Sequence, residues 1–402
     1  MAETPRAAWL TIIGIGEDGP DGLSLPAIAA LAAADLVIGS ARHLALLPGL
    51  KCPAIEWPVP FADGMTRLLE QRGRRVVMLA SGDPFWFGAG TSVTRHLAGD
   101  EWVAHPALST FTLSAARLGW ALEDTACLGL HAAPFTRLRP YLAQGRRALV
   151  LCRDGAAVAG LAHYLVDHGF GASRLDILEA LGGSRERIRR VTAEAFALDD
   201  ITHPVAVGIT VSGAGPTMPR VAGLPDALFD HDGQITRRPV RALTLSALAP
   251  RAGETLWDIG AGSGAIGIEW LLAHPANRAL AFEADPVRAA RARANAMALG
   301  VDRLDVIEGH APAVLMGHTA PDAVFIGGGL SPDLLDTLWR QLSPGTRLVA
   351  NAVTLESEAL LALWHADRGG QLLRIALSEA APLGTRRGWH ACYPIVQWSV
   401  VR

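Results

Sequence analysis

The sequence predicts an α/β protein with two domains, each built on a mainly parallel sheet. The chain has 402 residues, half of them hydrophobic, which is long for a single hydrophobic core. Short apolar strand-like runs alternate with helical segments in both halves, as in parallel sheets covered by helices. A stretch rich in Gly and Pro, 212–225, interrupts this alternation near the middle of the chain.

This Gly- and Pro-rich stretch sets the predicted domain boundaries. Residues 1–214 are predicted to form the first domain, 215–232 a linker and 233–402 the second domain. In the first domain, apolar runs predict strands at 10–13, 36–38, 76–79, 102–103, 148–151, 177–178 and 204–209.

The second domain shows the alternation more regularly. Its predicted strands are 256–259, 280–283, 306–308, 323–326 and 347–350, and its predicted helices are 266–273, 286–299, 332–342 and 356–367. At the end of the chain, 372–376 and 395–401 are expected to form an antiparallel pair joined by a long loop.

Composition and charge exclude several classes of protein. The net charge of -3, without a run of like charges, argues against a nucleic-acid partner. The N-terminal residues lack the pattern of an export signal, and the longest weakly polar stretch, 27–38, is shorter than the roughly 20 residues needed to span a bilayer. The four cysteines are scattered without a CxxC pair, so we expect no metal and a reduced, cytoplasmic location.

A Gly-rich turn marks the first candidate site in the second domain. Residues 255–264 read as an apolar strand that ends in Asp258 and continues into Gly260-Ala-Gly-Ser-Gly264, which opens a helix. Small residues let the backbone approach a ligand, and the helix N-terminus offers free N–H groups. The next strand ends in Glu283, whose carboxylate would accept hydrogen bonds from both hydroxyls of a ribose. An NAD site has the same pair of features.

Further segments distinguish between these alternatives. With the Gly-rich turn, the segments 232–246, 308–312, 322–329 and 351–356 resemble the class I methyltransferases, and within them the cobalt-precorrin C15 methyltransferases that also remove a carboxyl group. The resemblance covers 233–402 and implies a Rossmann-like, mainly parallel twisted sheet that binds S-adenosylmethionine. It implies a donor site lined by Thr236, Gly260, Ala261, Gly262, Ser263, Gly264, Glu283 and Ala311.

The start of the helix after Thr236 carries the candidate substrate ligands. Thr236 is expected to cap this helix. Arg237, Arg238 and Arg241 lie at the beginning of the helix, and guanidinium groups suit a substrate with many carboxylates, so we expect at least one of them to bind substrate. The other arginine-rich run, 185–190, is interpreted as a solvated helix face, with the alternative that its arginines meet substrate carboxylates.

The first domain carries a different set of motifs. Gly14-Ile-Gly16-Glu-Asp-Gly19 matches the dinucleotide pattern GxGxxG, but a loop follows it where that motif requires a helix. The segments 79–86, 105–111 and 116–120 together resemble the tetrapyrrole methylases of the class III fold over 9–212. This resemblance implies two subdomains that hold a second S-adenosylmethionine between them. The implied donor-binding residues are Gly14, Gly16, Gly82, Asp83, Pro84, Ser109 and Thr110.

As a whole, the chain resembles the decarboxylating C5,15-methyltransferases of corrin (vitamin B12) biosynthesis. The resemblance implies a homo-oligomer that methylates C5 and C15 of a precorrin-6 intermediate and removes the C12 acetate carboxyl, giving precorrin-8. The electron-rich ring is itself the nucleophile, so the protein has to align the reactants and exclude water. The sequence therefore predicts no particular catalytic side chain. The alternative is a methyltransferase for RNA or a modified protein in which one domain only binds the donor and regulates.

Overall fold

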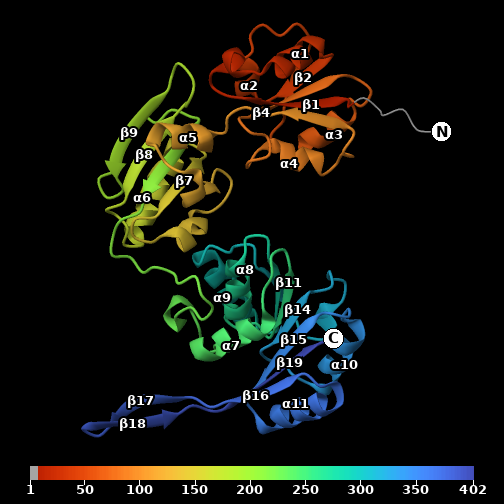
Figure 1. The fold of residues 1–402 in the computed structure, drawn as a ribbon, viewed down its shortest axis with the longest axis vertical. Helices are drawn as coiled ribbons and strands as arrows, with labels where there is room; N and C mark the ends of the chain where they lie inside the picture. The colour runs from red at the N-terminus through yellow and green to blue at the C-terminus, as the bar shows by residue number, and fades with distance from the viewer. Residues whose placement is uncertain (1–7) are drawn as a thin grey trace, which may run out of the picture. The chain divides into compact units, whose positions relative to one another are not determined.

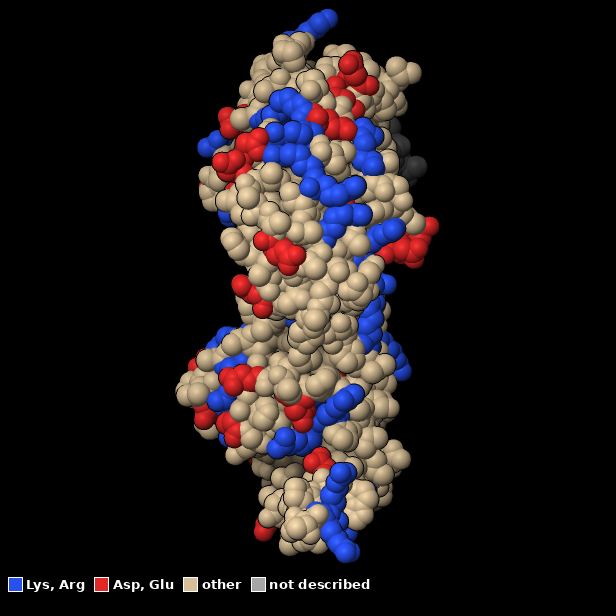
Figure 2. Space-filling model, turned by 90° about the vertical axis from the view of Figure 1, so that its left-hand side faces the viewer, with Lys and Arg blue, Asp and Glu red and all other residues tan. Residues whose placement is uncertain are grey.

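The computed structural model describes residues 8–402, which fall into two compact α/β units. Unit 1 comprises the described residues up to 134 together with 141–216, and unit 2 comprises 135–140 and 217–402. The units are coloured red to yellow-green and green to blue in Figure 1. Among residues 8–402, no helix combines the length and apolar character that crossing a membrane requires. On the face shown in Figure 2, basic and acidic side chains are intermingled over both units.

Unit 1 begins with a five-stranded sheet in which all neighbouring strands are parallel, in the order β3-β2-β4-β1-β5. The central strands are buried along almost their whole length because helices cover the sheet. The strands are β1 (Leu10–Ile15), β2 (Leu36–Gly39), β3 (Ala54–Glu56), β4 (Val76–Ser81) and β5 (Trp102–His105), and the helices are α1 (Leu25–Ala33), α2 (Ala41–Ala45), α3 (Asp63–Leu69) and α4 (Ala89–Thr94).

A second five-stranded sheet completes unit 1, in the order β6-β7-β10-β8-β9. Only the β6–β7 pair is parallel, and the remaining pairs are antiparallel. The strands are β6 (Thr125–Gly129), β7 (Arg147–Cys152), β8 (Arg174–Glu179), β9 (Arg187–Thr192) and β10 (Val205–Thr210), and the helices are α5 (Thr110–Leu118) and α6 (Gly155–Asp167). The seven strands predicted for the first domain are present, while β3, β6 and β9 were not predicted.

The interpretation of 185–190 as a helix face is wrong, because most of this run forms strand β9. Arg187 and Arg189 pair with the buried carboxylate of Glu179 on β8, at 2.8 and 2.9 Å. Arg190 pairs with the buried Asp176, also on β8, at 2.7 Å. These cross-strand ion pairs neutralise two buried carboxylates, a tertiary effect that outweighs local helix propensity.

Unit 2 contains a seven-stranded sheet in the order β13-β12-β11-β14-β15-β19-β16. Five strands are parallel, and β19 and β16 close the sheet antiparallel, as predicted. The strands are β11 (Thr255–Ile259), β12 (Arg278–Glu283), β13 (Asp305–Glu308), β14 (Ala323–Ile326), β15 (Arg347–Ala352), β16 (Gln371–Ile375) and β19 (Ile395–Val401). The helices are α7 (Arg238–Leu248), α8 (Ala265–Ala273), α9 (Pro286–Ala298), α10 (Pro332–Gln341) and α11 (Leu355–Arg368).

Helices cover both faces of this sheet. One apolar cluster includes Leu248 of α7, Ile268 of α8 and Ala292 of α9. A separate cluster includes Leu338 of α10 and Leu361 of α11. The sheet is therefore buried on both sides, which is the predicted doubly covered arrangement.

The segment between β16 and β19 is a hairpin where a loop was expected. Strands β17 (Ser378–Leu383) and β18 (Arg386–Ala391) pair with each other and extend away from the large sheet (Figure 1). Gly384 in the connecting turn has a φ of +59°, which favours glycine. The exposed side chains of Trp389 and Leu383 on this hairpin pack against no core.

Candidate active sites

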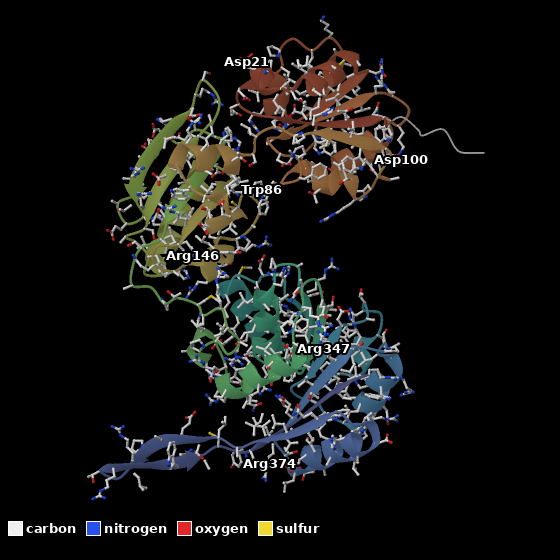
Figure 3. The ribbon with its side chains drawn as sticks, in the orientation of Figure 1. Asp21, Trp86, Asp100, Arg146, Arg347 and Arg374 are labelled. Carbon is white, nitrogen blue, oxygen red and sulfur yellow. The ribbon has the colours of Figure 1, made fainter. Side chains whose placement is uncertain are left out.

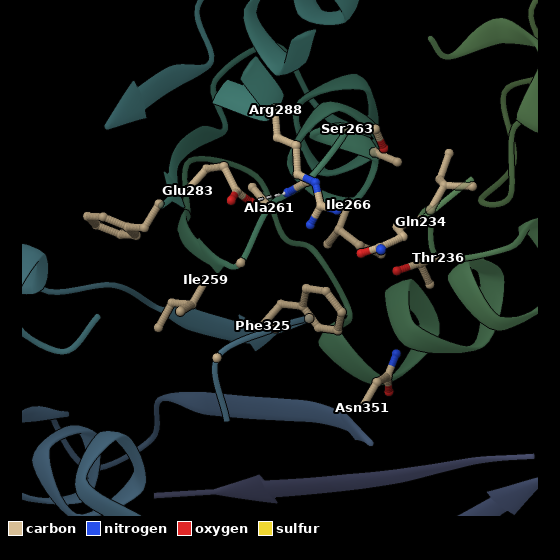
Figure 4. A pocket seen from close by; sticks show the side chains of 18 of the residues that line it. Gln234, Thr236, Ile259, Ala261, Ser263, Ile266, Glu283, Arg288, Phe325 and Asn351 are labelled. Carbon is tan, nitrogen blue, oxygen red and sulfur yellow. Dashed lines mark hydrogen bonds between the residues drawn. The ribbon is translucent and has the colours of Figure 1, made fainter. Parts of the chain in front are cut away.

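The site in unit 2 is a cavity of about 520 Å³ at the carboxyl edge of the sheet (Figure 4). Its walls come from the segments that follow β11, β12, β13, β14 and β15, because parallel strands bring their carboxyl ends to one edge. The volume is in the range of small-molecule sites. Predicted donor-site residues that line the cavity are Thr236, Gly260, Ala261, Gly262, Ser263, Glu283 and Ala311.

The Gly-rich turn forms one wall of this cavity. Gly260 has a φ of +69°, and a Cβ there would lie 2.6 Å from the backbone nitrogen of Gly328. Gly262 also has a positive φ, but a Cβ there would meet only the carbonyl oxygen of Gln234, at 3.6 Å. Gly260 therefore permits close packing of two loops, while Gly262 leaves open space beside the backbone. Gly264 does not line the cavity and lies at the start of α8.

Glu283 ends β12 and points across the turn toward the cavity (Figure 4). One carboxylate oxygen accepts a hydrogen bond from the backbone of Gly262 at 2.7 Å, and the other accepts from Asp285 at 3.0 Å. The residue is buried. Each carboxylate oxygen has a second lone pair, so the group can still accept two hydrogen bonds from a ligand.

Asp258, at the end of β11, is a fully buried carboxyl group outside the cavity wall. Burial raises the pKa of Asp258 to about 7; a 2.9 Å hydrogen bond from the backbone of Gly267 opposes this rise and the charge of Glu283 adds to it. Its other oxygen has no hydrogen-bond partner within residues 8–402. Asp258 thus supports the turn from β11 into α8 from behind.

The three candidate substrate arginines are not equivalent. Arg237 lines the cavity and its side chain is 61% exposed, whereas Arg238 does not line it. The prediction for Arg241 is wrong, because its side chain is completely buried and pairs with Glu269 at 2.5 Å and Asp226 at 3.0 Å. At this position of α7 the side chain faces the core, where a charge must be paired.

The predicted capping role of Thr236 is also wrong. Helix α7 begins at Arg238, and its N-cap is Arg237, which makes no side-chain capping bond. Pro239 in the first turn fixes this start. Thr236 instead lies just before the helix, facing the cavity, where its side chain is available to a ligand (Figure 4).

Sequence reasoning missed Asn351 as a site residue. Its side chain faces the cavity from the end of β15 (Figure 4), and its amide is held on both sides. The amide nitrogen donates to the Thr244 hydroxyl at 3.0 Å, and the amide oxygen accepts from Gln397 at 2.9 Å. These three residues are far apart in the sequence, so no local pattern could have grouped them.

The site in unit 1 is a cavity of about 610 Å³ between its two sheets. Trp86, which follows β4, is labelled in Figure 3 and packs its ring against that of Phe111 at 5.0 Å. The ring centroid of Phe87 lies 5.9 Å from that of Phe111, so aromatic side chains form one wall. The predicted donor-site residues that line this cavity are Gly16, Gly82, Asp83, Ser109 and Thr110.

Gly14 and Pro84, also predicted to bind the donor, do not line this cavity. A Cβ at Gly14 would lie 1.9 Å from the carbonyl oxygen of Gly82 and 2.5 Å from the backbone nitrogen of Ala107. Only glycine fits where these three segments meet. Ser109 caps α5 through a 3.0 Å bond from the Thr112 backbone and thereby orients the loop that reaches the cavity.

A polar cluster in the unit 1 cavity was also missed. Arg42, His43 and Ser81 line it together with Arg153, His131 and His203. The sequence motifs pointed to none of these six residues. Burial and the adjacent Arg42 lower the pKa of His43 to about 4, against a smaller opposing effect of the Leu79 backbone. His43 is therefore neutral at pH 7.

Two families match the two halves of the chain. The tetrapyrrole (corrin/porphyrin) methylases match residues 9–197, and the precorrin methyltransferase domain matches residues 227–402. A solved C-terminal domain of precorrin-6Y C5,15-methyltransferase from Rhodobacter capsulatus is 54% identical, with a TM-score of 0.45, and covers 46% of this chain and 100% of its own.

Two curated relatives match over nearly the full length, and both are named precorrin-6Y C(5,15)-methyltransferase [decarboxylating]. The Sinorhizobium protein is 49% identical over 396 residues, which is 97% of this chain and 96% of the relative. The Mycobacterium tuberculosis (strain CDC 1551 / Oshkosh) protein is 41% identical over 396 residues, 98% of this chain and 100% of the relative. At these identities and coverages, this chain belongs to the family of decarboxylating precorrin-6Y C5,15-methyltransferases.

Proposed function

We propose that this chain methylates C5 and C15 of a precorrin-6 intermediate and decarboxylates its C12 acetate, giving precorrin-8, in the cytoplasm. S-adenosylmethionine is the methyl donor, as the methyltransferase family implies. The observation that carries the proposal is the presence of one separate cavity in each unit, each lined by residues suited to the donor. We assign one donor molecule to each cavity.

The unit 2 cavity fits the donor in three respects. The carboxylate of Glu283 keeps free lone pairs for the two ribose hydroxyls. The open space beside Gly262 admits the ligand close to the backbone. Ala311, in the segment after β13, is small enough to lie against a flat adenine ring.

The unit 1 cavity fits the donor through a different construction. Asp83 accepts a 2.9 Å bond from the Phe85 backbone and so is fixed in the loop after β4. Gly82, with a φ of +51°, turns this loop into the cavity opposite Ser109 and Thr110. The cavity lining thus combines polar groups with aromatic rings, the usual combination in a small-molecule site.

We assign the C15 transfer and the decarboxylation to unit 2, and the C5 transfer to unit 1. A Salmonella typhimurium protein named cobalt-precorrin-6B C(15)-methyltransferase (decarboxylating) is 33% identical over 169 residues, covering only 40% of this chain but 86% of its own length. Its name mentions C15 methylation and decarboxylation but no C5 methylation. Because it matches only part of this chain, it supports the assignment of these two reactions to a single unit.

The residues of unit 2 then act mainly by binding and orientation. The exposed guanidinium of Arg237 at the cavity lies where it can pair with a substrate carboxylate, and Arg238 remains a second candidate. The fixed amide of Asn351 offers a donor and an acceptor in a defined orientation. Decarboxylation needs an electron sink, which the conjugated ring supplies once protonated, so the protein must desolvate the carboxylate and deliver a proton.

We propose that the chain forms a homo-oligomer and that it binds no nucleic acid. The hairpin of β17 and β18 carries Trp389, with 80% of its surface exposed, and is followed by Tyr393 with 90% exposed. Large exposed aromatic side chains at one place are typical of interaction surfaces. Light scattering coupled to gel filtration measures the mass in solution, and a monomer at micromolar concentration would contradict the proposal.

The decisive experiment combines the purified chain, S-adenosylmethionine and a precorrin-6 intermediate. Mass spectrometry should find a product with two added methyl groups and one CO2 fewer, and NMR with a ¹³C-methyl donor should place the methyl groups on C5 and C15. A product with only one added methyl group at saturating donor would contradict the proposed function. Recovery of the substrate with its methyl and carboxyl groups unchanged would also contradict it.

A further inference from the structure

Ser81 and His43 form a hydrogen-bonded pair in the unit 1 cavity. Ser81 is the last residue of β4, and His43 lies on α2, which follows the neighbouring strand β2. The His43 Nε2 atom lies 2.9 Å from the Ser81 hydroxyl oxygen. The histidine is buried and the serine is exposed, and both line the cavity. The serine is therefore the member of the pair that a ligand can reach.

The neighbouring Arg42 determines the direction of this hydrogen bond. Its guanidinium lies 2.9 Å from the His43 Nε2 atom and donates to the Ser81 oxygen at 2.6 Å. A guanidinium only donates, so a protonated Nε2 would face it donor to donor. Nε2 is therefore assigned as the unprotonated nitrogen, with a single lone pair. Arg42 lies closer to the Ser81 oxygen than to Nε2, so we assign its hydrogen bond to Ser81 and the Ser81 hydroxyl proton to the Nε2 lone pair.

Glu17 holds Arg42 in this position. Its carboxylate pairs with Arg42 through one oxygen and with Arg185 through the other, at 2.9 Å for Arg185. The Glu17 side chain is 7% exposed and Arg42 28%, so their pair is largely shielded from water, whereas Arg185 is 56% exposed. The orientation of Arg42, and through it that of Ser81, is fixed before any ligand binds.

The reaction requires a group that accepts a proton at this place. A methyl transfer to a ring CH carbon forms a C–C bond and breaks the C–S bond of the sulfonium, whose electron pair stays on sulfur. The ring then carries one additional positive charge. It returns to its original charge when the C–H bond breaks, its electron pair re-enters the conjugated system, and one proton leaves.

We propose that Ser81 and His43 are the proton-accepting catalytic pair for C5 methylation, and that Arg42 is the residue that positions them. This inference rests on the proposed C5 activity of unit 1. Ser81 takes the proton from the methylated carbon as its own hydroxyl proton passes to Nε2 of His43, so no oxidant or further reactant is needed. The positive charge of Arg42 then favours release of the proton from His43 to water, which restores the neutral pair.

The test compares full-length His43→Gln and Ser81→Ala with the parent enzyme. Glutamine keeps a hydrogen-bonding group near Ser81 but accepts no proton. Because general base catalysis contributes about 100-fold or more, kcat for C5 methylation should fall about 100-fold in each variant with little change in KM. The double variant should lose no more than either single variant, since the two residues act as one unit. C15 methylation and CO2 release should continue at the parent rates.

A substrate that carries deuterium at C5 supplies a measurement that a purely structural role would not affect. Proton removal should become rate-limiting in the variants, so a primary isotope effect should appear or increase there relative to the parent. Ser81→Thr keeps the hydroxyl and should retain most of the C5 activity. His163→Gln and Ser92→Ala change exposed residues of the same types away from the cavity and should match the parent.

Several outcomes would overturn the inference. One is a kcat for C5 methylation that is unchanged in His43→Gln and Ser81→Ala. Another is a kcat that falls in these variants while the isotope effect stays equal to that of the parent. Loss of donor affinity in calorimetry, or a Ser81→Thr variant as inactive as Ser81→Ala, would also exclude the proton-accepting role. A parent enzyme that never methylates C5 would instead contradict the proposed function itself, so the two failures are distinguishable.

Discussion

The carboxylate of Glu283 accepts a 2.7 Å hydrogen bond from the backbone N–H of Gly262. This bond joins the end of β12 to the turn after β11, and both residues line the unit 2 cavity. The same carboxylate therefore shapes the Gly-rich turn and remains available to a ribose. Changes at these two positions should consequently affect the donor site in different ways.

Glu283→Gln should weaken donor binding to unit 2 by about 10- to 100-fold. Hydrogen bonds to a charged group contribute about 1.5 to 3 kcal/mol each, and about 1.4 kcal/mol corresponds to one decade in affinity. C15 methylation and CO2 release should both fall at limiting donor and recover when donor is raised. Parallel measurement of the two products across a donor titration checks this.

The matched control is Glu308→Gln. Glu308 is in register with Glu283 on the adjacent strand β13, but it pairs with Arg293 and does not line the cavity. Its donor titration should resemble that of the parent. If Glu283→Gln binds donor as tightly as the parent, the ribose assignment is wrong, and donor-independent CO2 release would show that the two reactions do not share one site.

Gly262→Arg should stop C15 methylation and leave C5 methylation intact. A side chain at Gly262 meets open cavity space, so the arginine would occupy the donor position. Gly317→Arg is a control with a similar positive φ in an exposed turn, and it should retain both activities. The complementary variant Asp83→Ala should lose C5 methylation alone. Both methyl transfers persisting in Gly262→Arg would show that this cavity is not the C15 site.

A break of the chain between residues 216 and 217 should give two fragments that fold and bind donor separately. Met218, Leu224 and Phe229, from the segment predicted as a linker, are buried in the core of unit 2. A fragment that starts at residue 217 should therefore be more stable than one that starts at 233. Urea unfolding and calorimetry with the donor test both statements, and a 217–402 fragment without cooperative unfolding would contradict them.

The free energy of unfolding of Asp258→Asn, relative to that of the parent, should be higher at pH 8 than at pH 4. The pKa of Asp258 rises from 3.8 to about 7 on folding, so the folded state binds the extra proton between these values. Stability from this group is full below about pH 4 and is lost as the pH rises through 7. The stability of the variant relative to the parent should increase by up to about 4 kcal/mol over this range.

Urea unfolding of both proteins at several pH values measures this difference. Titration of other groups is common to the two proteins and cancels in the comparison. Asp336→Asn, at an exposed position of α10, should show no such trend. A pH-independent difference between Asp258→Asn and the parent would mean that the buried carboxyl is ionised throughout.

The sequence by itself determined the α/β class, the five parallel strands of unit 2 and the glycine turn that meets Glu283. Hydrophobic periodicity and glycine positions are local properties, so they can be read along the chain. Residues predicted to bind the donor in the two units, including Gly82, Ser109 and Gly262, do line cavities because strand ends in a parallel sheet meet at one edge.

Only the tertiary structure decided which polar side chains meet one another. The 185–190 run became a strand because the carboxylates of Glu179 and Asp176 on β8 pair with its arginines. The Arg241 side chain points into the core and pairs with Glu269, 28 residues further along the chain. His43 lies within hydrogen-bonding distance of Ser81, 38 residues further along the chain. Such pairs depend on burial and on the packing of distant elements, which local spacing does not encode.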